Sequence, residues 1–221
     1  MDIEKNIKAA ILYRFGCIRY HSKQHIDYYF KNFYIPRKAL YIHIPKTGGT
    51  SISQIIYDKE DHHFSARELA FFYPKEFKNY YKFSVVRHPF DRIVSMYKYI
   101  QQHPQLEAFQ ELAIPDTFFD FIMNFLRPEI IKYQYFFWSQ KAYLCNHLGS
   151  VNQIDFIGRF ENFNESLCYI KSVLNTEKSI PWKNKSSAQV LFDQSLEKKL
   201  RKRVYELYKN DYYLFDYKPY S

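Results

Sequence analysis

Short apolar runs alternate along the chain with segments of helical periodicity. Three runs rich in β-prone residues predict buried strands, at residues 39–44, 82–86 and 154–157. Each run precedes a segment that predicts a helix, at residues 50–57, 89–102 and 165–174. Strands that alternate with helices indicate an α/β fold, in which helices cover both faces of a central parallel sheet.

Two further helices are predicted from local signals. Ser65 and Glu68 match the S-x-x-E pattern of a capping box, so a helix is expected to begin at about Ala66. Apolar residues recur at helical spacing over residues 196–207, and basic residues fill the opposite face of this helix. A basic face of this kind is usually a solvated surface, although it also suits an acidic glycan.

Length and composition limit the class of protein. The 221 residues contain no repeat or flexible linker, so we expect a single domain at residues 39–221, preceded by a basic, aromatic arm at residues 1–38. The arm suits either packing or surface binding. No run approaches the roughly 18 apolar residues of a membrane span, and the N-terminus lacks the pattern of a secretory signal. Peripheral contact with a membrane is left open.

The cysteines bear on the cellular compartment. The chain has three, and they are scattered, odd in number and without metal-ligand spacing. Reduced thiols of this kind favour a cytoplasmic protein. A Golgi, secretory or periplasmic location is the alternative if an export signal precedes the sequence.

The charge of the chain favours an anionic ligand. Its 32 basic and 23 acidic residues leave a formal net charge of +9. A polyanionic partner would be a nucleotide, a nucleic acid, an acidic glycan or an anionic lipid. The alternative is a basic surface that is merely solvated.

The segment 41–51 (YIHIPKTGGTS) predicts the site of an anion. It joins the first strand to the first helix, so main-chain N–H groups and the positive helix end point toward one place. Its glycines permit close approach, its hydroxyls add donors and its lysine adds a charge. These residues are Lys46, Thr47, Gly48, Gly49, Thr50 and Ser51. In a Walker A motif the lysine follows the glycines, whereas Lys46 precedes them. A plain strand-to-helix turn is the alternative.

The second strand leads into another basic segment, 86–95 (VRHPFDRIVS). Arg87 leaves the strand end, where a guanidinium can grip a phosphate with two parallel N–H donors. Ser95 follows on the next helix and adds a hydroxyl. The alternative is a structural ion-pair cluster of Arg87, Asp91 and Arg92 around the start of that helix.

Both segments resemble motifs of one family. PKTGGTS is similar to the 5′-phosphosulfate loop of sulfotransferases. VRHPFDRIVS resembles the motif with which these enzymes bind the 3′-phosphate of their donor, 3′-phosphoadenosine 5′-phosphosulfate (PAPS). The I-P-K-T-G-G-T-S form is most similar to the carbohydrate branch, which includes uronyl and heparan-sulfate 2-O-sulfotransferases and bacterial relatives. The resemblance covers about residues 40–217 and implies a P-loop-like three-layer fold.

The resemblance also implies a reaction and a role for Lys46. A sulfotransferase of this branch moves a sulfuryl group from PAPS to a hydroxyl, here of a carbohydrate, and needs no metal. The positive charge of Lys46 is then expected to act at the bridging oxygen and the leaving phosphate.

Two more segments resemble family motifs, 154–162 (IDFIGRFEN) and 183–187 (KNKSS). They imply that Arg159, Lys185 and Ser186 contact the nucleotide. A structural ion pair explains Arg159 equally well.

The acceptor hydroxyl must lose a proton, and histidine titrates in the suitable range near neutral pH. His62 and His63 lie just before the helix predicted at Ala66. In the resembling 2-O-sulfotransferases a histidine lies in this interval shortly before a serine, which makes His63 the first candidate for the base and His62 the second. Two surface histidines beside a helix cap are the alternative. Glu68 is a further candidate that its capping role explains, and His43 is interpreted as a core histidine.

Other classes of protein remain open. A P-loop nucleotide kinase needs a lysine after the glycines and an acid that holds Mg²⁺, neither of which this loop offers. A non-enzymatic binder of polyanions would explain the net charge, but no nucleic-acid motif is found. An inactive relative that keeps the fold is a third alternative. The acceptor, the position sulfated and the oligomeric state do not follow from the sequence.

Overall fold

The computed structural model describes residues 23–59, 62–110, 112–146, 148–178 and 193–219. The chain divides into two units, one of Met1–Val86 with Gln140–Lys183 and one of Arg87–Ser139 with Asn184–Ser221. The sheet and the loop at 45–51 belong to the first unit, and the motif that begins at Arg87 opens the second. No helix in the described ranges is long and apolar enough to cross a membrane.

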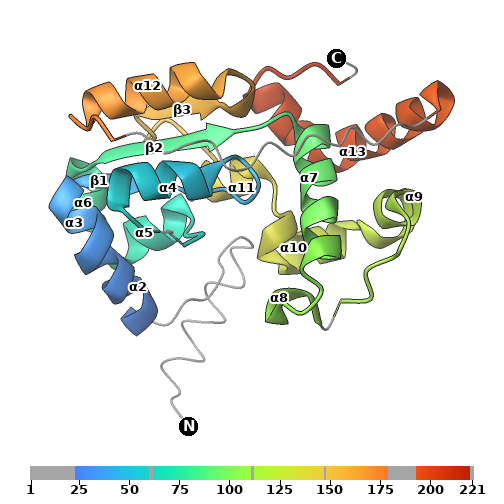
Figure 1. Ribbon diagram of the computed structural model, residues 1–221, viewed down its shortest axis with the longest axis horizontal. Coiled ribbons are helices and arrows are strands. Elements are labelled where there is room, and N and C mark those ends of the chain that lie inside the picture. Colours follow the sequence, from blue (N-terminus) through green and yellow to red (C-terminus); the bar gives the residue numbers. More distant parts are fainter. Residues whose placement is uncertain (1–22, 60–61, 111, 147, 179–192, 220–221) are drawn as a thin grey trace, which may run out of the picture. The chain divides into compact units, whose positions relative to one another are not determined.

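The sheet of the first unit has three parallel strands in the order β1-β2-β3. They are β1 (Ala39–Tyr41), β2 (Tyr81–Val86) and β3 (Phe156–Arg159) (Figure 1). Phe83 of the central strand lies opposite Tyr41 on one side and Phe156 on the other. All of β1 and all but the first residue of β2 are buried, as expected for a parallel sheet covered on both faces. The α/β fold predicted from the sequence is confirmed.

Two strands differ from their predicted bounds. The first is shorter than residues 39–44, although the main-chain N–H of Ile42 still donates to β2 at 2.9 Å. The third begins at Phe156 rather than at residue 154. The main-chain N–H of Asp155 still donates to the Lys82 carbonyl at 2.9 Å, whereas the Asp155 carboxylate accepts from the main-chain N–H of Lys82 at 2.7 Å and lies 3.0 Å from its Nζ. A side chain thus occupies a position where a strand ladder would continue.

Helices flank this sheet. Figure 1 shows α4 (Gly49–Tyr57) on one side of the strands and α12 (Phe163–Val173) on the other. The unit also contains α5 (Ala66–Phe72), α6 (Pro74–Asn79), α11 (Gln140–Leu144) and the short 3₁₀ helix η4 (Phe160–Asn162). The helices predicted at residues 50–57, 66 onward and 165–174 are therefore confirmed to within two residues at their starts.

The described N-terminal residues pack into the first unit. They form α2 (Lys23–Tyr29), the π-helical turn η1 (Phe30–Tyr34) and the single turn α3 (Ile35–Arg37). Ile26, Phe30, Phe33 and Tyr34 follow helical spacing and are buried. The ring of Phe30 stacks on Tyr73 with the centroids 3.4 Å apart. The part of the predicted arm that the structure describes is thus a packing segment.

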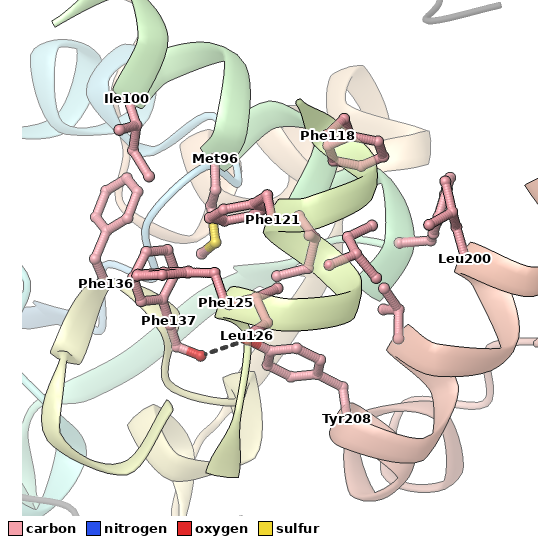
Figure 2. Packing of buried hydrophobic residues seen from close by; sticks show 14 of the residues in the cluster. Met96, Ile100, Phe118, Phe121, Phe125, Leu126, Phe136, Phe137, Leu200 and Tyr208 are labelled. Carbon is pink, nitrogen blue, oxygen red and sulfur yellow. Dashed lines mark hydrogen bonds between the residues drawn. The ribbon is translucent and has the colours of Figure 1, made fainter. Parts of the chain in front are cut away.

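All of the regular secondary structure described in the second unit is helical. It comprises α7 (Pro89–Gln102), α8 (Glu107–Gln110), α9 (Phe118–Asp120), η2 (Phe121–Phe125), α10 (Pro128–Tyr133), η3 (Tyr135–Phe137) and α13 (Gln194–Leu214). Figure 2 shows its core, in which Met96 of α7 and Leu200 of α13 belong to one buried cluster with Phe121. The Tyr208 hydroxyl donates to the Phe137 carbonyl at 2.8 Å within this cluster. Helix α7 has its predicted bounds, and α13 extends the predicted helix at both ends.

Candidate active site

The loop after β1 has a left-handed backbone at two positions. Lys46 has a φ of 70° and Gly48 a φ of 82°, whereas φ is not positive at Thr47 between them. Alternation of this kind turns main-chain N–H groups toward a common point and forms a concavity that binds anions. The Thr47 hydroxyl donates to the Ile44 carbonyl at 2.9 Å and so holds the turn in shape.

Helix α4 begins where this loop ends. Its N-cap is Gly48, which has no side chain to accept from the first N–H groups, and its first turn contains no acidic residue. The N–H groups of this turn lack intrahelical acceptors, and the positive end of the helix dipole is not neutralised by an acid of the turn. Lys46, Thr50 and Ser51 are all partly exposed. N–H groups, hydroxyls and a lysine together fit a phosphosulfate group.

Two phenylalanine rings cover Gly48 of the loop, Phe160 from the segment at 154–162 and Phe163 directly after that segment. A Cβ atom on Gly48 would lie 2.6 Å from the Phe163 ring and 3.1 Å from the Phe160 ring. Glycine is therefore required at this position both by the positive φ and by the close approach of the rings. Phe160 directly follows Arg159, which ends β3 and is partly exposed. The structure thus brings the loop at 45–51 together with the segment that carries Arg159.

His63 lies near the same loop. Its Nδ1 is 2.9 Å from the main-chain oxygen of His43, and the two imidazole centroids are 4.2 Å apart. Because a carbonyl oxygen only accepts hydrogen bonds, Nδ1 of His63 carries the hydrogen in this contact. The lone pair of the neutral ring is then on Nε2. His63 is partly exposed, as a base that receives a proton from a substrate has to be.

His43 connects His63 to the loop. The side chain is buried, as predicted for a core histidine. Its ring also borders Gly49, where a Cβ atom would lie 2.8 Å from Cε1 of His43 and closer still to Nε2. Sequence reasoning missed this second role, since a histidine between apolar, β-prone residues has the same pattern in the core and beside a site.

His62 has a different environment. Its ring centroid is 4.5 Å from that of His25, 5.4 Å from that of Tyr29 and 5.2 Å from that of Phe64. The distance to the His63 ring is 6.3 Å. His62 therefore belongs to an aromatic cluster formed with helix α2, whereas His63 contacts the residue that borders the loop.

Glu68 is accounted for by its capping box. The carboxylate accepts from the main-chain N–H of Ser65 at 2.8 Å and from its hydroxyl at 2.9 Å. In return, the main-chain N–H of Glu68 donates to Ser65 Oγ at 3.3 Å. The side chain is buried, and these reciprocal hydrogen bonds are those of a capping box at a helix start.

In the second unit, Arg87 and Ser95 are both partly exposed, Arg87 directly after the end of β2 and Ser95 on α7. Lys98 lies one turn after Ser95, and its pKa is lowered by burial and by the nearby charge of Arg87. Two cations close to each other, with a hydroxyl one helical turn away, suit a phosphate. Lys98 was not predicted, and its i+3 spacing from Ser95 is the sequence signal that would have identified it.

Arg92, in the same motif, has a structural role. It is 1% exposed, and its guanidinium donates to the carbonyls of Trp138 at 2.9 Å and Phe136 at 3.5 Å. Oδ2 of Asp91 lies 3.9 Å from Nδ1 of His88. The motif therefore combines a buried arginine that joins two segments of the unit with a partly exposed arginine at its start.

Two predicted residues, Lys185 and Ser186, lie outside the described residues. Within the described part of the chain, no group of three or more His, Cys, Asp or Glu side chains is arranged to hold a metal ion.

Comparison with known proteins agrees with the family that the segments 41–51 and 86–95 resemble. A family model with the description "Sulfotransferase family" matches residues 36–218, a range that runs through both units. The chain belongs to the sulfotransferase family. It is a PAPS-dependent sulfotransferase with a P-loop-like α/β fold, which sets aside the kinase and the non-enzymatic alternatives. Searches of curated proteins and of solved structures gave no match.

Proposed function

We propose that this sulfotransferase acts on a hydroxyl of a carbohydrate, as the uronyl and heparan-sulfate 2-O-sulfotransferases and their bacterial relatives do. The I-P-K-T-G-G-T-S form of the loop supports this acceptor class, as does the net charge of +9, which suits an acidic glycan. The observation that carries the proposal is the hydrogen bond from His63 Nδ1 to the His43 carbonyl. This bond places the lone pair of the His63 ring on Nε2. The residue that accepts the bond, His43, borders the loop at Gly49.

The loop and the start of α4 are proposed to bind the 5′-phosphosulfate end of PAPS. Lys46 supplies the charge, and residues 47–51 supply main-chain N–H groups and hydroxyls. The hydroxyl of Thr47 holds the turn through Ile44, so Thr47 would bind the donor through its main chain.

The 3′-phosphate and the nucleoside are proposed to bind elsewhere in the chain. Arg87 and Ser95 would hold the 3′-phosphate, and Lys98 adds a second cation beside Arg87. Arg159 would contact the nucleotide from the end of β3. Lys185 and Ser186 are assigned to it by the resemblance alone.

When bound, PAPS supplies a sulfuryl group whose S–O bond to the 5′-phosphate breaks as a new S–O bond to the acceptor oxygen forms, releasing adenosine 3′,5′-bisphosphate. Lys46 and the N–H groups of α4 stabilise the negative charge on the phosphate side. Nε2 of His63 accepts the proton of the acceptor hydroxyl. The His43 carbonyl, by accepting from Nδ1–H, orients the ring and stabilises the imidazolium that forms.

The choice of base is tested with His63→Ala and its matched neighbour His62→Ala. We expect His63→Ala to lower the transfer rate by about 10²–10⁴-fold, the usual contribution of a positioned base, and to leave the binding of adenosine 3′,5′-bisphosphate unchanged. His62→Ala should keep most of the transfer rate, because His62 packs in the cluster with α2. The opposite result would move the base by one residue.

The acceptor class is tested with ³⁵S-labelled PAPS and a panel of heparosan, chondroitin, lipids and small alcohols. Incorporation of label into a polysaccharide that contains uronic acid is the expected result. Label that enters lipids or small alcohols and no glycan would overturn the proposed acceptor and leave the sulfotransferase class intact.

A further inference from the structure

His43 occupies the space between the loop and His63. On one side its ring borders Gly49, and on the other its centroid is 4.2 Å from that of His63. Tyr41 of β1 stacks on His43 with the centroids 5.2 Å apart and an angle of 18° between the rings. Tyr41 stacks in turn on Phe83 of β2 at 5.0 Å. With 5% of its surface exposed, the His43 side chain is held by the sheet and has little room to move.

His43 contacts His63 in two ways that constrain different features of the ring. The main-chain oxygen accepts from Nδ1 at 2.9 Å, which restrains one atom of the imidazole. A single hydrogen bond leaves the plane of the ring free to tilt about that atom. The contact between the two imidazoles restrains the plane itself.

The same arrangement explains why residue 49 is glycine. Gly49 does not have a positive φ, so its backbone conformation does not require glycine. The required feature is space, because any Cβ atom at this position would collide with the His43 ring. The start of α4 and the His43 side chain are therefore in direct contact.

We infer that His43 is a positioning residue for His63. Its imidazole, packed between Gly49 and His63, fixes the plane of the His63 ring relative to the loop. The inference rests on the proposed function, in which the loop binds the leaving phosphate and Nε2 of His63 takes the acceptor proton. The acceptor oxygen forms its bond to sulfur as the S–O bond to that phosphate breaks, so the base needs a defined position relative to the loop. A displacement of about 1 Å is enough to slow an enzyme on the order of 100-fold.

The first experiment observes His63 directly by NMR. The full chain is labelled with ¹⁵N-histidine, saturated with adenosine 3′,5′-bisphosphate and examined in two-bond ¹H–¹⁵N correlation spectra. His63, assigned by its loss in His63→Ala, should show a single tautomer with the proton on Nδ1. In His43→Ala the main-chain acceptor of this hydrogen bond remains, so the proton should stay on Nδ1, but the His63 signals should broaden because the plane of the ring is no longer restrained. His25→Ala removes a neighbour of His62 instead and should leave the His63 signals unchanged.

Two outcomes of this experiment overturn the inference. One is a His63 line width in His43→Ala that equals the wild-type line width. The other is a mixture of tautomers already in the wild-type protein, a result that does not require any variant to fold. Neither depends on sulfuryl transfer, so the inference can fail while the proposed function stands.

The second experiment is a double-mutant cycle on transfer, with ³⁵S-labelled PAPS and the panel glycan that wild-type enzyme labels. His43→Ala should lower kcat by about 10–100-fold while the dissociation constant of adenosine 3′,5′-bisphosphate stays near its wild-type value. His43→Gln restores side-chain bulk and should recover part of this loss. In a His63→Ala background, His43→Ala should have no further effect, because His43 acts through His63.

Equal losses in the two backgrounds would show that His43 acts independently of His63 and would overturn the inference. Failure of the proposed function has a different signature. In that case wild-type enzyme labels no glycan of the panel, or His63→Ala keeps the wild-type kcat.

Discussion

Lys46 combines a positive charge with a backbone conformation that is unfavourable for its residue type. Its φ of 70° falls in the left-handed region, which L-residues other than asparagine and aspartate seldom occupy. Lys38 and Asp58 also have positive φ, but they are the C-caps of α3 and α4, where this conformation is common. Lys46 is not at a helix C-terminus. Its strain is instead located where the loop turns N–H groups toward the predicted anion.

This strain predicts different stabilities for two inactive variants. Lys46→Gly and Lys46→Ala both remove the ammonium group and should both abolish transfer. Since glycine adopts positive φ without strain, the glycine variant should be more stable to urea unfolding than the alanine variant by about 1 kcal/mol. Lys38→Gly is the matched control, because it relieves the same conformation outside the site and should keep the transfer activity. Equal stabilities of the two Lys46 variants would argue against strain in the loop.

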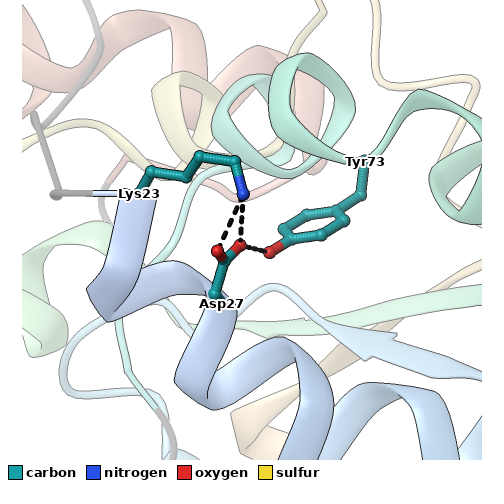
Figure 3. Close-up of polar contacts among 3 residues, drawn as sticks. All are labelled: Lys23, Asp27 and Tyr73. Atoms are coloured by element: carbon teal, nitrogen blue, oxygen red, sulfur yellow. Dashed lines mark hydrogen bonds and ion pairs between the residues drawn. The ribbon is translucent and has the colours of Figure 1, made fainter.

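Tyr73 contacts both Asp27 of α2 and Phe30 of η1, and so adds one polar and one aromatic contact to the packing of the N-terminal helices. The Tyr73 hydroxyl and the Lys23 ammonium both donate to the Asp27 carboxylate (Figure 3), and Phe30 stacks on the Tyr73 ring. The pKa of Asp27 is lowered, chiefly by the hydrogen bond from Lys23 and then by the bond from Tyr73. The pKa of Tyr73 is raised, chiefly by burial and then by Asp27, so the phenol remains a donor.

The lowered pKa of Asp27 makes this polar contact depend on pH. The ionised carboxylate stabilises the folded state above its ordinary pKa of about 4, and this contribution is lost as the pH falls through the lower folded-state pKa. Because the side chain is 28% exposed, Asp27→Asn should lower the free energy of unfolding at about pH 7 by less than about 1 kcal/mol. The difference from wild type should shrink toward acid pH. A loss of unfolding free energy in Asp27→Asn that is the same at about pH 7 and at acid pH would contradict this account.

Tyr73→Phe separates the polar contact from the aromatic one. It keeps the stack with Phe30 and should cost about 0.5–1.5 kcal/mol at about pH 7, the usual contribution of one hydrogen bond. Tyr28→Phe is the control, since Tyr28 lies on α2 with Asp27 and is 52% exposed, and it should leave the urea midpoint unchanged.

Local signals were sufficient for the elements that border the site. Helix α7 has its predicted bounds because Pro89 suits the first turn and apolar residues follow at helical spacing. Helix α5 begins at the residue that its capping box predicts. The short helices between Glu107 and Phe137 were not predicted. Their aromatic and apolar residues face a shared core from several directions, so no single period is visible in the sequence.

At the scale of the whole molecule, membership of the sulfotransferase family predicts which nucleotide stabilises the folded protein. A ligand at about 100 times its dissociation constant adds about 2.7 kcal/mol to the free energy of unfolding. In a chain of this size that is a rise in Tm of about 5–10 °C. We expect adenosine 3′,5′-bisphosphate to give this shift and ATP with Mg²⁺ to give much less. The reverse ranking in a thermal-shift assay would contradict the proposed donor site.

The same assay isolates the role of Arg87. Arg87→Ala should remove most of the shift at the same nucleotide concentration and abolish transfer through lost donor binding. Arg127→Ala, which changes an exposed arginine of the same unit, should keep the full shift. A wild-type shift in Arg87→Ala would remove this arginine from the donor site.

Contiguous motifs were enough to identify the chemistry of this protein. Residues 45–51 and 87–95 each follow a strand and lead into a helix, so local structure alone orients their donors. Neither motif requires knowledge of a contact between distant parts of the chain. The sheet was predictable for a similar reason, since the alternation of strands and helices restricts its topology.

The surroundings of the loop could be learned only from the folded chain. Phe160 packs on Gly48, and His43 lies between Gly49 and His63, although these residues share no periodicity along the sequence. Neighbouring histidines likewise have separate environments, because His62 packs with α2 while His63 faces His43. Whether a side chain is structural or functional depends on what packs against it, and a pattern along one dimension does not contain that information.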